Sequence, residues 1–460
     1  MALSRDRNFY RQFFRLIFFI ALQNIIVLSV NLADNVMLGA YSENALSGVA
    51  LANQLQFLMQ MLIGGVSEGM CVLTAQYWGS RDTATIKKLT GCGLLLVTGV
   101  TLVFFTAATL WGRQILELLV GNKGDVAGVL GEGMAYLRII SWTYILLGLT
   151  TVLLGSLRSA EIVRLGTVVS LTTLVVNVSL NYCLIFGRLG FPEMGTRGAA
   201  LATLIARGVE LLLVLVYVLC IDRKLRIRLK DLAGAGMALW RDYIRVSVPV
   251  ILSGGSWGIA MFIQAAVIGR LGTSAIAANS IAGTLFQLVS VVAYAGASAS
   301  AVLTGKLVGA GEIEELKPKV NAMQVIFLFI GLLTGATLLL LKGWIVSLYD
   351  VSEEARNLAI QFLLVLSVTS VGTAYQCSCL TGIVRGGGNP RFVFYNDLIF
   401  MWGLVLPASL LGAFVWKLPP VWVFALLKSD QILKCFVAAV EVNRYKWVRK
   451  LTQPAPGSDE

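Results

Sequence analysis

Four polar residues that suit the binding of a small cation stand inside long apolar stretches: Asp34, Asn177, Asn181 and Thr203. A carboxylate at the centre of a membrane helix costs about 3 kcal/mol or more, so it usually faces a wet cavity and marks a functional site. Asn177 and Asn181 are four residues apart and share one helix face. Oxygen ligands suit hard cations, and a lone carboxylate in a low-dielectric cavity suits a proton. Asp34 is therefore the leading candidate for holding a proton or a metal cation.

The helices that must position these residues follow from composition. The chain has 460 residues, 57% hydrophobic and 13% charged, whereas a soluble protein carries about 25% charge. Apolar runs of 18 or more residues each predict a spanning helix. We count twelve, at 14–38, 46–76, 91–111, 134–156, 165–187, 198–221, 246–269, 275–303, 322–342, 358–383, 393–415 and 420–441.

Depth along these helices predicts that the four residues meet. At a rise of about 1.5 Å per residue, Asp34 lies about 27 Å into its helix, Asn177 about 18 Å and Asn181 about 24 Å. Thr203 lies about 8 Å from the start of a helix that runs the opposite way. If the helices are neighbours, the side chains surround one oxygen-lined site. The alternative for the amides and the hydroxyl is interhelical hydrogen bonding without a ligand.

Basic residues predict the orientation of the chain. With the N-terminus inside, the inner loops and termini hold 25 Lys and Arg, and the outer loops hold 9. This bias places both termini in the cytoplasm of a multi-pass protein in the cell membrane. The net charge of +12 is thus a topology signal and gives no support to a nucleic-acid partner.

The chain is predicted to consist of two six-helix lobes. The N-lobe spans 1–221, a basic cytoplasmic linker spans 222–245, the C-lobe spans 246–450, and a disordered tail follows at 451–460. Residues 34–87 slide onto 264–317 with a constant shift of 230, which matches Gly39 with Gly269 and Gly79 with Gly309. Repeats of one orientation are a transporter plan with the site at the repeat interface.

Other polar residues within the predicted helices have less certain roles. Glu68 is either a second protonatable site or the partner of a nearby cation. Asp397 is expected to bond Arg385 or Arg391. The remaining candidates either line a cavity or hold helices together, and they are Gln54, Gln264, Gln287 and Arg207, the last of which is expected to pair with Glu210.

Signatures of enzymes are missing from the sequence. It has no histidine, no clustered carboxylates and no Walker A motif, and the glycine-rich stretch 382–391 follows no strand. We therefore expect no enzyme activity and no cofactor.

Four stretches resemble the multidrug and toxic compound extrusion (MATE) family. They are NLADNVMLGAYSENALSGVALANQL (31–55), AQYWGSRD (75–82), NVSLNYCLIFGRLGFPEMGTRGAALATLIAR (177–207) and VPVILSGGSWGIAMFIQAAVIGRLGTSAIAANSI (248–281). The resemblance implies two pseudo-symmetric six-helix lobes in a V, alternating access, and export of organic cations in exchange for Na+ or H+. It also implies that Asp34, Asn177, Asn181 and Thr203 form the coupling-cation site, and a monomer would suffice.

The chain departs from the family pattern in two places. Some members carry acids on the seventh and tenth helices, where Trp257 and Cys379 stand here. Many members have a proline in the first helix, and this chain has none in 14–38. One alternative function is a lipid-linked oligosaccharide flippase of the same wider superfamily, although only Arg207 supplies a basic group well inside a helix of the first half. An integral membrane enzyme and a facilitator of another twelve-helix family are further alternatives.

Overall fold

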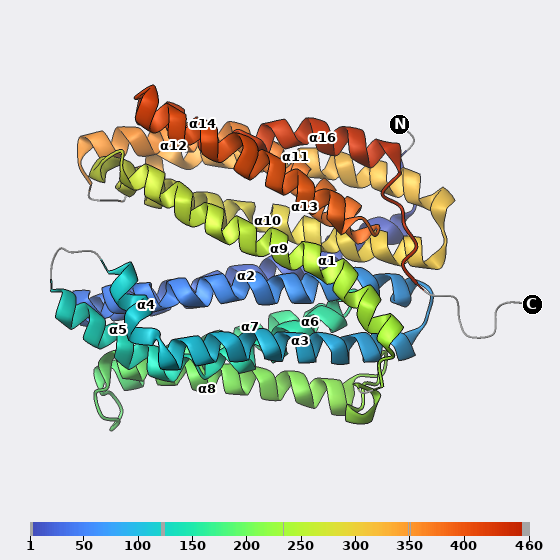
Figure 1. Cartoon of the computed structure of the whole chain (residues 1–460), viewed down its shortest axis with the longest axis horizontal. Helices are drawn as coiled ribbons and strands as arrows, with labels where there is room; N and C mark the ends of the chain where they lie inside the picture. The colour runs from blue at the N-terminus through green and yellow to red at the C-terminus, as the bar shows by residue number, and fades with distance from the viewer. Residues whose placement is uncertain (1–2, 121–124, 233, 348, 350, 453–460) are drawn as a thin grey trace, which may run out of the picture. The chain divides into compact units, whose positions relative to one another are not determined.

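The structure is a computed structural model that describes residues 3–120, 125–232, 234–347, 349 and 351–452. The described chain is built from helices, without a strand, which confirms the all-α class (Figure 1). The long helical segments are α1 (Arg7–Tyr41), α2 (Glu43–Gly79), α3 (Thr83–Leu110), α7 (Arg164–Phe186), α8 (Gly195–Val216) with π-helical η1 (Tyr217–Ile221), α9 (Met237–Gly269), α10 (Thr273–Ala310), α11 (Ile313–Val346), α12 (Glu353–Cys377) with π-helical η3 (Ser378–Val384), and α13 (Pro390–Leu398) with η4 (Ile399–Val405), α14 (Leu406–Leu410) and η5 (Leu411–Val415). The shorter ones are α4 (Gly112–Leu119), α5 (Val126–Ile140), α6 (Thr143–Ser159), η2 (Leu229–Leu232), α15 (Pro420–Leu427) and α16 (Asp430–Arg444).

Ten segments of the described chain are long and apolar enough to cross a membrane, and the pair α5 and α6 passes the same test with a bend of 50°. These eleven correspond to eleven of the predicted spans. The twelfth, 420–441, is divided into α15 and α16 on either side of Lys428 and Ser429. Their 8 and 15 residues extend about 12 and 22 Å, so neither alone crosses a hydrocarbon core of about 30 Å.

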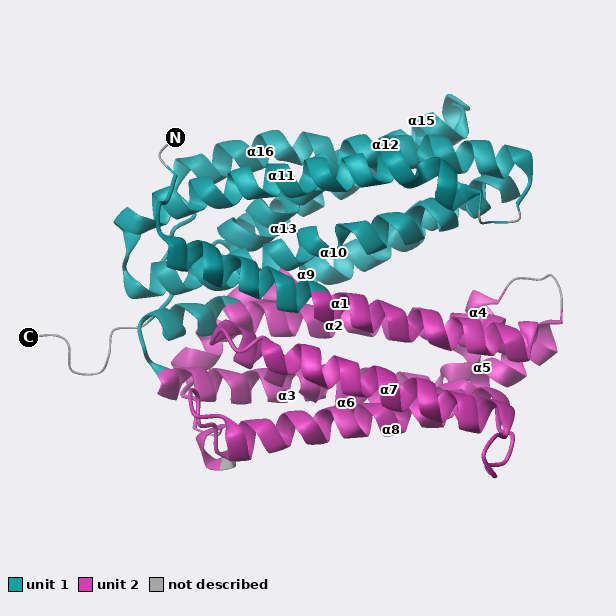
Figure 2. Ribbon diagram, turned by 180° about the vertical axis from the view of Figure 1, so that it is seen from behind, with its two compact units in different colours: residues 1–21, 72–82, 252–460 teal, residues 22–71, 83–251 magenta. Residues whose placement is uncertain are grey.

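The chain forms two compact units (Figure 2). Unit 1 comprises residues 1–21, 72–82 and 252–460, and unit 2 comprises residues 22–71 and 83–251. Helices α1, α2 and α9 therefore contribute residues to both units. The division into lobes at 1–221 and 246–450 stays a prediction.

The predicted linker is anchored to unit 2 rather than extended. The Asp222 carboxylate caps the turn that follows α8 by accepting backbone hydrogen bonds from Leu225 and Arg226, each at 3.0 Å. Asp231 of η2 accepts a hydrogen bond from Lys87 of α3 at 3.1 Å. That hydrogen bond and the lysine charge lower the pKa of the Asp231 carboxyl.

Within unit 1 the last turns of α2 cross α10 through glycines. A Cβ added to Gly79 would collide with the Lys306 carbonyl oxygen, and one added to Gly309 would collide with the Gln76 carbonyl oxygen. The third member of the contact, Gly305, faces Ala75. Each pair matches under the shift of 230 residues found in the sequence, so the crossing has the symmetry of the repeat.

The segment after α16, residues 445–452, is termed here the C-terminal strap (Figure 1). Its Trp447 is fully buried and packs on Gly387. The Gln76 amide of α2 donates to the Arg449 carbonyl at 3.1 Å and accepts from the Leu451 backbone N–H at 2.8 Å. The predicted disordered tail begins within this strap, and residues 453–460 lie outside the described residues.

Candidate cation site in unit 2

Three helices of unit 2 bring the predicted site residues together. The Asn181 amide of α7 donates to Asp34 Oδ1 of α1 at 2.5 Å and to Asn177 Oδ1 at 3.1 Å. The Asn177 amide in turn donates to Thr203 Oγ1 of α8 at 3.2 Å. The four residues therefore lie at a common depth, as counted from the sequence, and one continuous chain of hydrogen bonds joins the carboxylate to the hydroxyl.

Close packing of α7 against α8 sets this geometry. Helix α7 ends at Gly187, whose φ of 64° is left-handed and favours glycine. Near the start of α8, a Cβ on Gly198 would lie 2.5 Å from the Leu184 carbonyl oxygen. The two backbones can approach only because Gly198 has no side chain, and the approach puts Thr203 within reach of Asn177.

The site leaves oxygen atoms open. Asn181 is 0% exposed, and no described residue donates a hydrogen bond to its buried Oδ1. Asp34 is only half-buried, and among the described residues its Oδ2 receives no hydrogen bond. A buried acceptor without a donor is unfavourable. A bound Na+ or a proton at the carboxylate would satisfy these oxygens.

Arg207 lies one helical turn beyond Thr203 on the same face of α8. Its guanidinium donates to the Glu210 carboxylate at 2.5 Å. This is the pairing that their spacing predicts. Because Glu210 balances the arginine charge locally, Asp34 can still serve as the anionic group of the site.

The other candidates lie away from this hydrogen-bond chain. Glu68 of α2 accepts from Arg158 of α6 at 2.7 Å, one of the two arrangements expected from the sequence. Gln54 is partly exposed on α2, and Gln287 is exposed on α10. Gln264 is buried on α9 and donates to the Met401 sulfur at 3.4 Å. Gln264 and Gln287 belong to unit 1, and the Asp34 site to unit 2.

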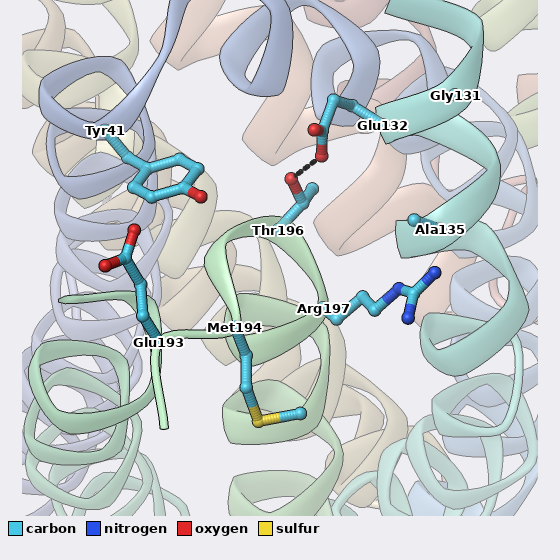
Figure 3. A pocket seen from close by; sticks show the side chains of 8 residues that line it. All are labelled: Tyr41, Gly131, Glu132, Ala135, Glu193, Met194, Thr196 and Arg197. Carbon is cyan, nitrogen blue, oxygen red and sulfur yellow. Dashed lines mark hydrogen bonds between the residues drawn. The ribbon is translucent and has the colours of Figure 1, made fainter. Parts of the chain in front are cut away.

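A cavity of about 450 Å³ in unit 2 was not anticipated from the sequence. Figure 3 shows Tyr41 of α1 and the Glu193 carboxylate on one side and the hydrogen bond from Thr196 to Glu132 on another. Tyr41 lies two turns beyond Asp34 on α1. The sequence feature that could have indicated this cavity is Glu132, an acid inside a helix-forming stretch. Its partner Thr196 lies 64 residues away along the chain, so no local pattern links the two.

Asp397 of α13 has partners other than the arginines named from the sequence. Its Oδ1 accepts from Lys434 of α16 at 2.9 Å, and its Oδ2 accepts from Ser253 of α9 at 2.7 Å. The sequence offered Arg385 and Arg391 because they are close along the chain. Helix packing instead supplies groups that are 37 and 144 residues away.

Comparison with known proteins agrees with this architecture. The model of the MatE family matches residues 20–183 and 249–411. A probable multidrug resistance protein NorM from Thermotoga maritima is 26% identical over 391 residues, covering 84% of this chain and 82% of that protein. A protein of the same name from Listeria monocytogenes is 25% identical over 442 residues, covering 95% of this chain and 94% of that protein.

Solved structures share the fold at lower identity. A MATE structure in the bent conformation superposes with a TM-score of 0.84 at 20% identity, over 95% of this chain and 96% of that one. A MOP superfamily transporter from Pyrococcus furiosus gives a TM-score of 0.84 at 21% identity, over 98% and 100%. With both halves matched by the family model and the fold shared end to end, this membrane-spanning chain belongs to the MatE family.

Proposed function

We propose that the protein is a secondary active transporter that exports organic cations or drugs in exchange for Na+ or H+ by alternating access. In this proposal it lies in the cytoplasmic membrane with both termini in the cytoplasm, works as a monomer and catalyses no chemical reaction. Family membership and relatives described as probable multidrug resistance proteins support the class of function.

The observation that carries the proposal is the contact of Asp34 with Asn181. One carboxylate, two amides and a hydroxyl meet inside unit 2, and Asn181 Oδ1 lacks a donor among the described residues. Oxygen ligands of this kind suit Na+, while protonation of the single carboxylate would give it a donor of its own. Asp34, Asn177 and Asn181 would hold Na+, and Asp34 alone would hold H+.

Coupling follows from competition for one negative charge. Ionised Asp34 attracts either the coupling cation or a cationic substrate. If the protein binds both less favourably together than separately, the arrival of one promotes release of the other, and this negative coupling is reciprocal. Exchange then needs only that the two conformations expose Asp34 to opposite sides of the membrane.

The experiment that tests this proposal is efflux of a fluorescent organic cation from vesicles, energised in turn by a Na+ gradient and a pH gradient. Efflux that depends on one gradient in the wild type and is lost in Asp34→Asn supports it. Efflux absent under both gradients would contradict it and would favour a narrower substrate or a lipid-flipping role.

A further inference from the structure

Unit 1 holds a second membrane-embedded carboxylate that the proposed mechanism does not use. Asp397 lies within the span formed by α13 to η5, and its side chain is 29% exposed. A charged group inside a span is expensive unless it faces a wet cavity or a partner, so it is a functional-site hypothesis.

The partner of Asp397 is a lysine that serves two acids. Lys434 is 6% exposed and lies 2.9 Å from Asp397 and 3.4 Å from Asp430 one turn away on α16. Lys434 is therefore shared between two carboxylates rather than paired with one. The nearby Lys428 donates to the Gln264 carbonyl oxygen at 3.5 Å, lies 5.7 Å from the Phe424 ring centroid and also interacts electrostatically with Asp430.

An indole is fixed beside this carboxylate. Trp402 of η4 donates from Nε1 to Ser256 Oγ at 2.6 Å and is 36% exposed. Ser256 and Ser253, the hydroxyl partner of Asp397, are three residues apart on α9 and share one face. Asp397 and Trp402 therefore line the same face of α9, and η4 is a π-helical segment, a feature frequent at functional sites.

This combination matches the chemistry of an organic cation. A carboxylate supplies the counter-charge, and an indole face attracts a cation within about 6 Å of its centroid. The second exposed indole, Trp257, directly follows Ser256 on α9. The hydroxyl of Ser256 holds the Trp402 nitrogen, so the polar edge of this indole is satisfied while its faces remain available.

We propose that Asp397 and Trp402, together with Ser253 and Trp257, form a substrate subsite in unit 1 for aromatic or quaternary organic cations. Lys434 is its internal counter-ion. In the empty subsite the ammonium neutralises Asp397, and a bound cation replaces it while Lys434 stays paired with Asp430. The inference rests on the proposed transport of organic cations and adds to it: the substrate has a second place to bind, besides the Asp34 site where it competes with the coupling cation.

Equilibrium binding of radiolabelled tetraphenylphosphonium to the purified full-length protein in detergent tests this inference. We expect Asp397→Asn to weaken binding about tenfold, which corresponds to about 1.4 kcal/mol. We expect Lys434→Gln to tighten binding about threefold or more, because it removes the competing ammonium. If the ion pair were merely structural, both substitutions would change the affinity for tetraphenylphosphonium in the same direction. That result, or affinities within twofold of wild type, overturns the inference.

Two further variants keep the test decisive if the ion-pair variants fold poorly. Trp402→Phe retains an aromatic face and should bind nearly as well as wild type, whereas Trp402→Ala should lose about fivefold or more, about 1 kcal/mol of cation–π attraction. Trp422→Ala is the matched control, since Trp422 is an exposed indole on α15. Equal affinity of Trp402→Ala and Trp422→Ala would contradict the subsite.

Failure of the subsite can be told from failure of the proposed transport. Asp34→Asn should still bind tetraphenylphosphonium while it loses ion-driven efflux. A wild-type protein that shows ion-driven efflux of another substrate but binds no tetraphenylphosphonium would overturn the subsite and leave the exchange mechanism standing.

Discussion

Gly79 of α2 packs against the backbone of α10, and Gly309 of α10 packs against the backbone of α2 in the equivalent way. The Cα of Gly79 faces the Lys306 carbonyl oxygen, and that of Gly309 faces the Gln76 carbonyl oxygen. Both residue pairs are related by a shift of 230 positions, so the crossing is a pseudo-twofold contact in which small residues allow backbone against backbone. Any conformational change in this protein has to accommodate this crossing.

Enlarging either glycine at the crossing should destabilise the protein. Gly79→Ala and Gly309→Ala each place a methyl group against a backbone carbonyl, and overpacking of this kind typically costs about 1–3 kcal/mol. Thermal unfolding in detergent measures the effect. Gly283→Ala is the control, because its added Cβ meets nothing within 4 Å, and helix propensity makes that change neutral or favourable by up to about 1 kcal/mol. Equal unfolding temperatures for all three variants would contradict the crossing.

Removing the Gln76 amide should release the C-terminal strap. Gln76→Leu leaves the partly buried Arg449 carbonyl and Leu451 N–H without their side-chain partner, and a fully buried group left unsatisfied would cost about 1–3 kcal/mol, so we expect a smaller loss here. We expect faster proteolysis within 445–452 and a lower unfolding temperature. Gln54→Leu, a partly exposed position on the same helix, is the comparison. Wild-type proteolysis of Gln76→Leu would mean that Trp447 alone holds the strap.

The link between Lys87 and Asp231 should make stability depend on pH. Hydrogen bonding to Lys87 lowers the folded-state pKa of Asp231 below its unfolded value, so the carboxylate stabilises the folded protein above the unfolded pKa of about 3.9. That contribution is lost as pH falls through the lower folded-state pKa. The unfolding temperature of wild type should therefore exceed that of Asp231→Asn at pH 7, and the difference should narrow towards pH 3. A difference that does not change with pH would show that the charge is not involved.

Replacing Asn181 of the cation site should reduce ion-driven efflux more than replacing an asparagine elsewhere in unit 2. Asn181→Ala removes the hydrogen bond to Asp34 and an open oxygen ligand, and we expect ion-driven efflux to fall about tenfold or more. Asn181→Asp adds a second carboxylate and should tighten binding of the coupling cation. Asn44→Ala, which breaks a bond to Asp125 at 2.9 Å away from the site, should retain efflux. Equal rates for Asn181→Ala and Asn44→Ala would exclude Asn181 from the site.

Helix regularity made part of this architecture predictable. Asp34, Asn181 and Thr203 lie together because depth in a membrane helix can be counted from the sequence at a constant rise per residue. The glycine repeat could be recognised in the sequence because the two halves align at one constant shift without gaps. The functional role of these residues stays a prediction.

Contacts between segments far apart in the chain were not predictable. The hydrogen bond that Lys434 donates to Asp397 and the one that Leu451 donates to Gln76 depend on which segments become neighbours, and no local pattern encodes this. The break at Lys428 and Ser429 contains neither glycine nor proline, but it falls in the polar run Lys428-Ser429-Asp430-Gln431. Counting the whole stretch 420–441 as one apolar span passed over this polar run, which was the signal for the break.

Ion-driven efflux through the Asp34 site is the measurement that tests the account most directly. Vesicles that contain wild type, Asp34→Asn or Glu117→Gln, a control carboxylate on an exposed ion pair, would be loaded with a fluorescent organic cation and given a Na+ or a pH gradient. We predict that one gradient drives efflux in wild type and in Glu117→Gln and that Asp34→Asn, although folded, shows none. An Asp34→Asn variant with wild-type, gradient-dependent efflux would contradict the central claim.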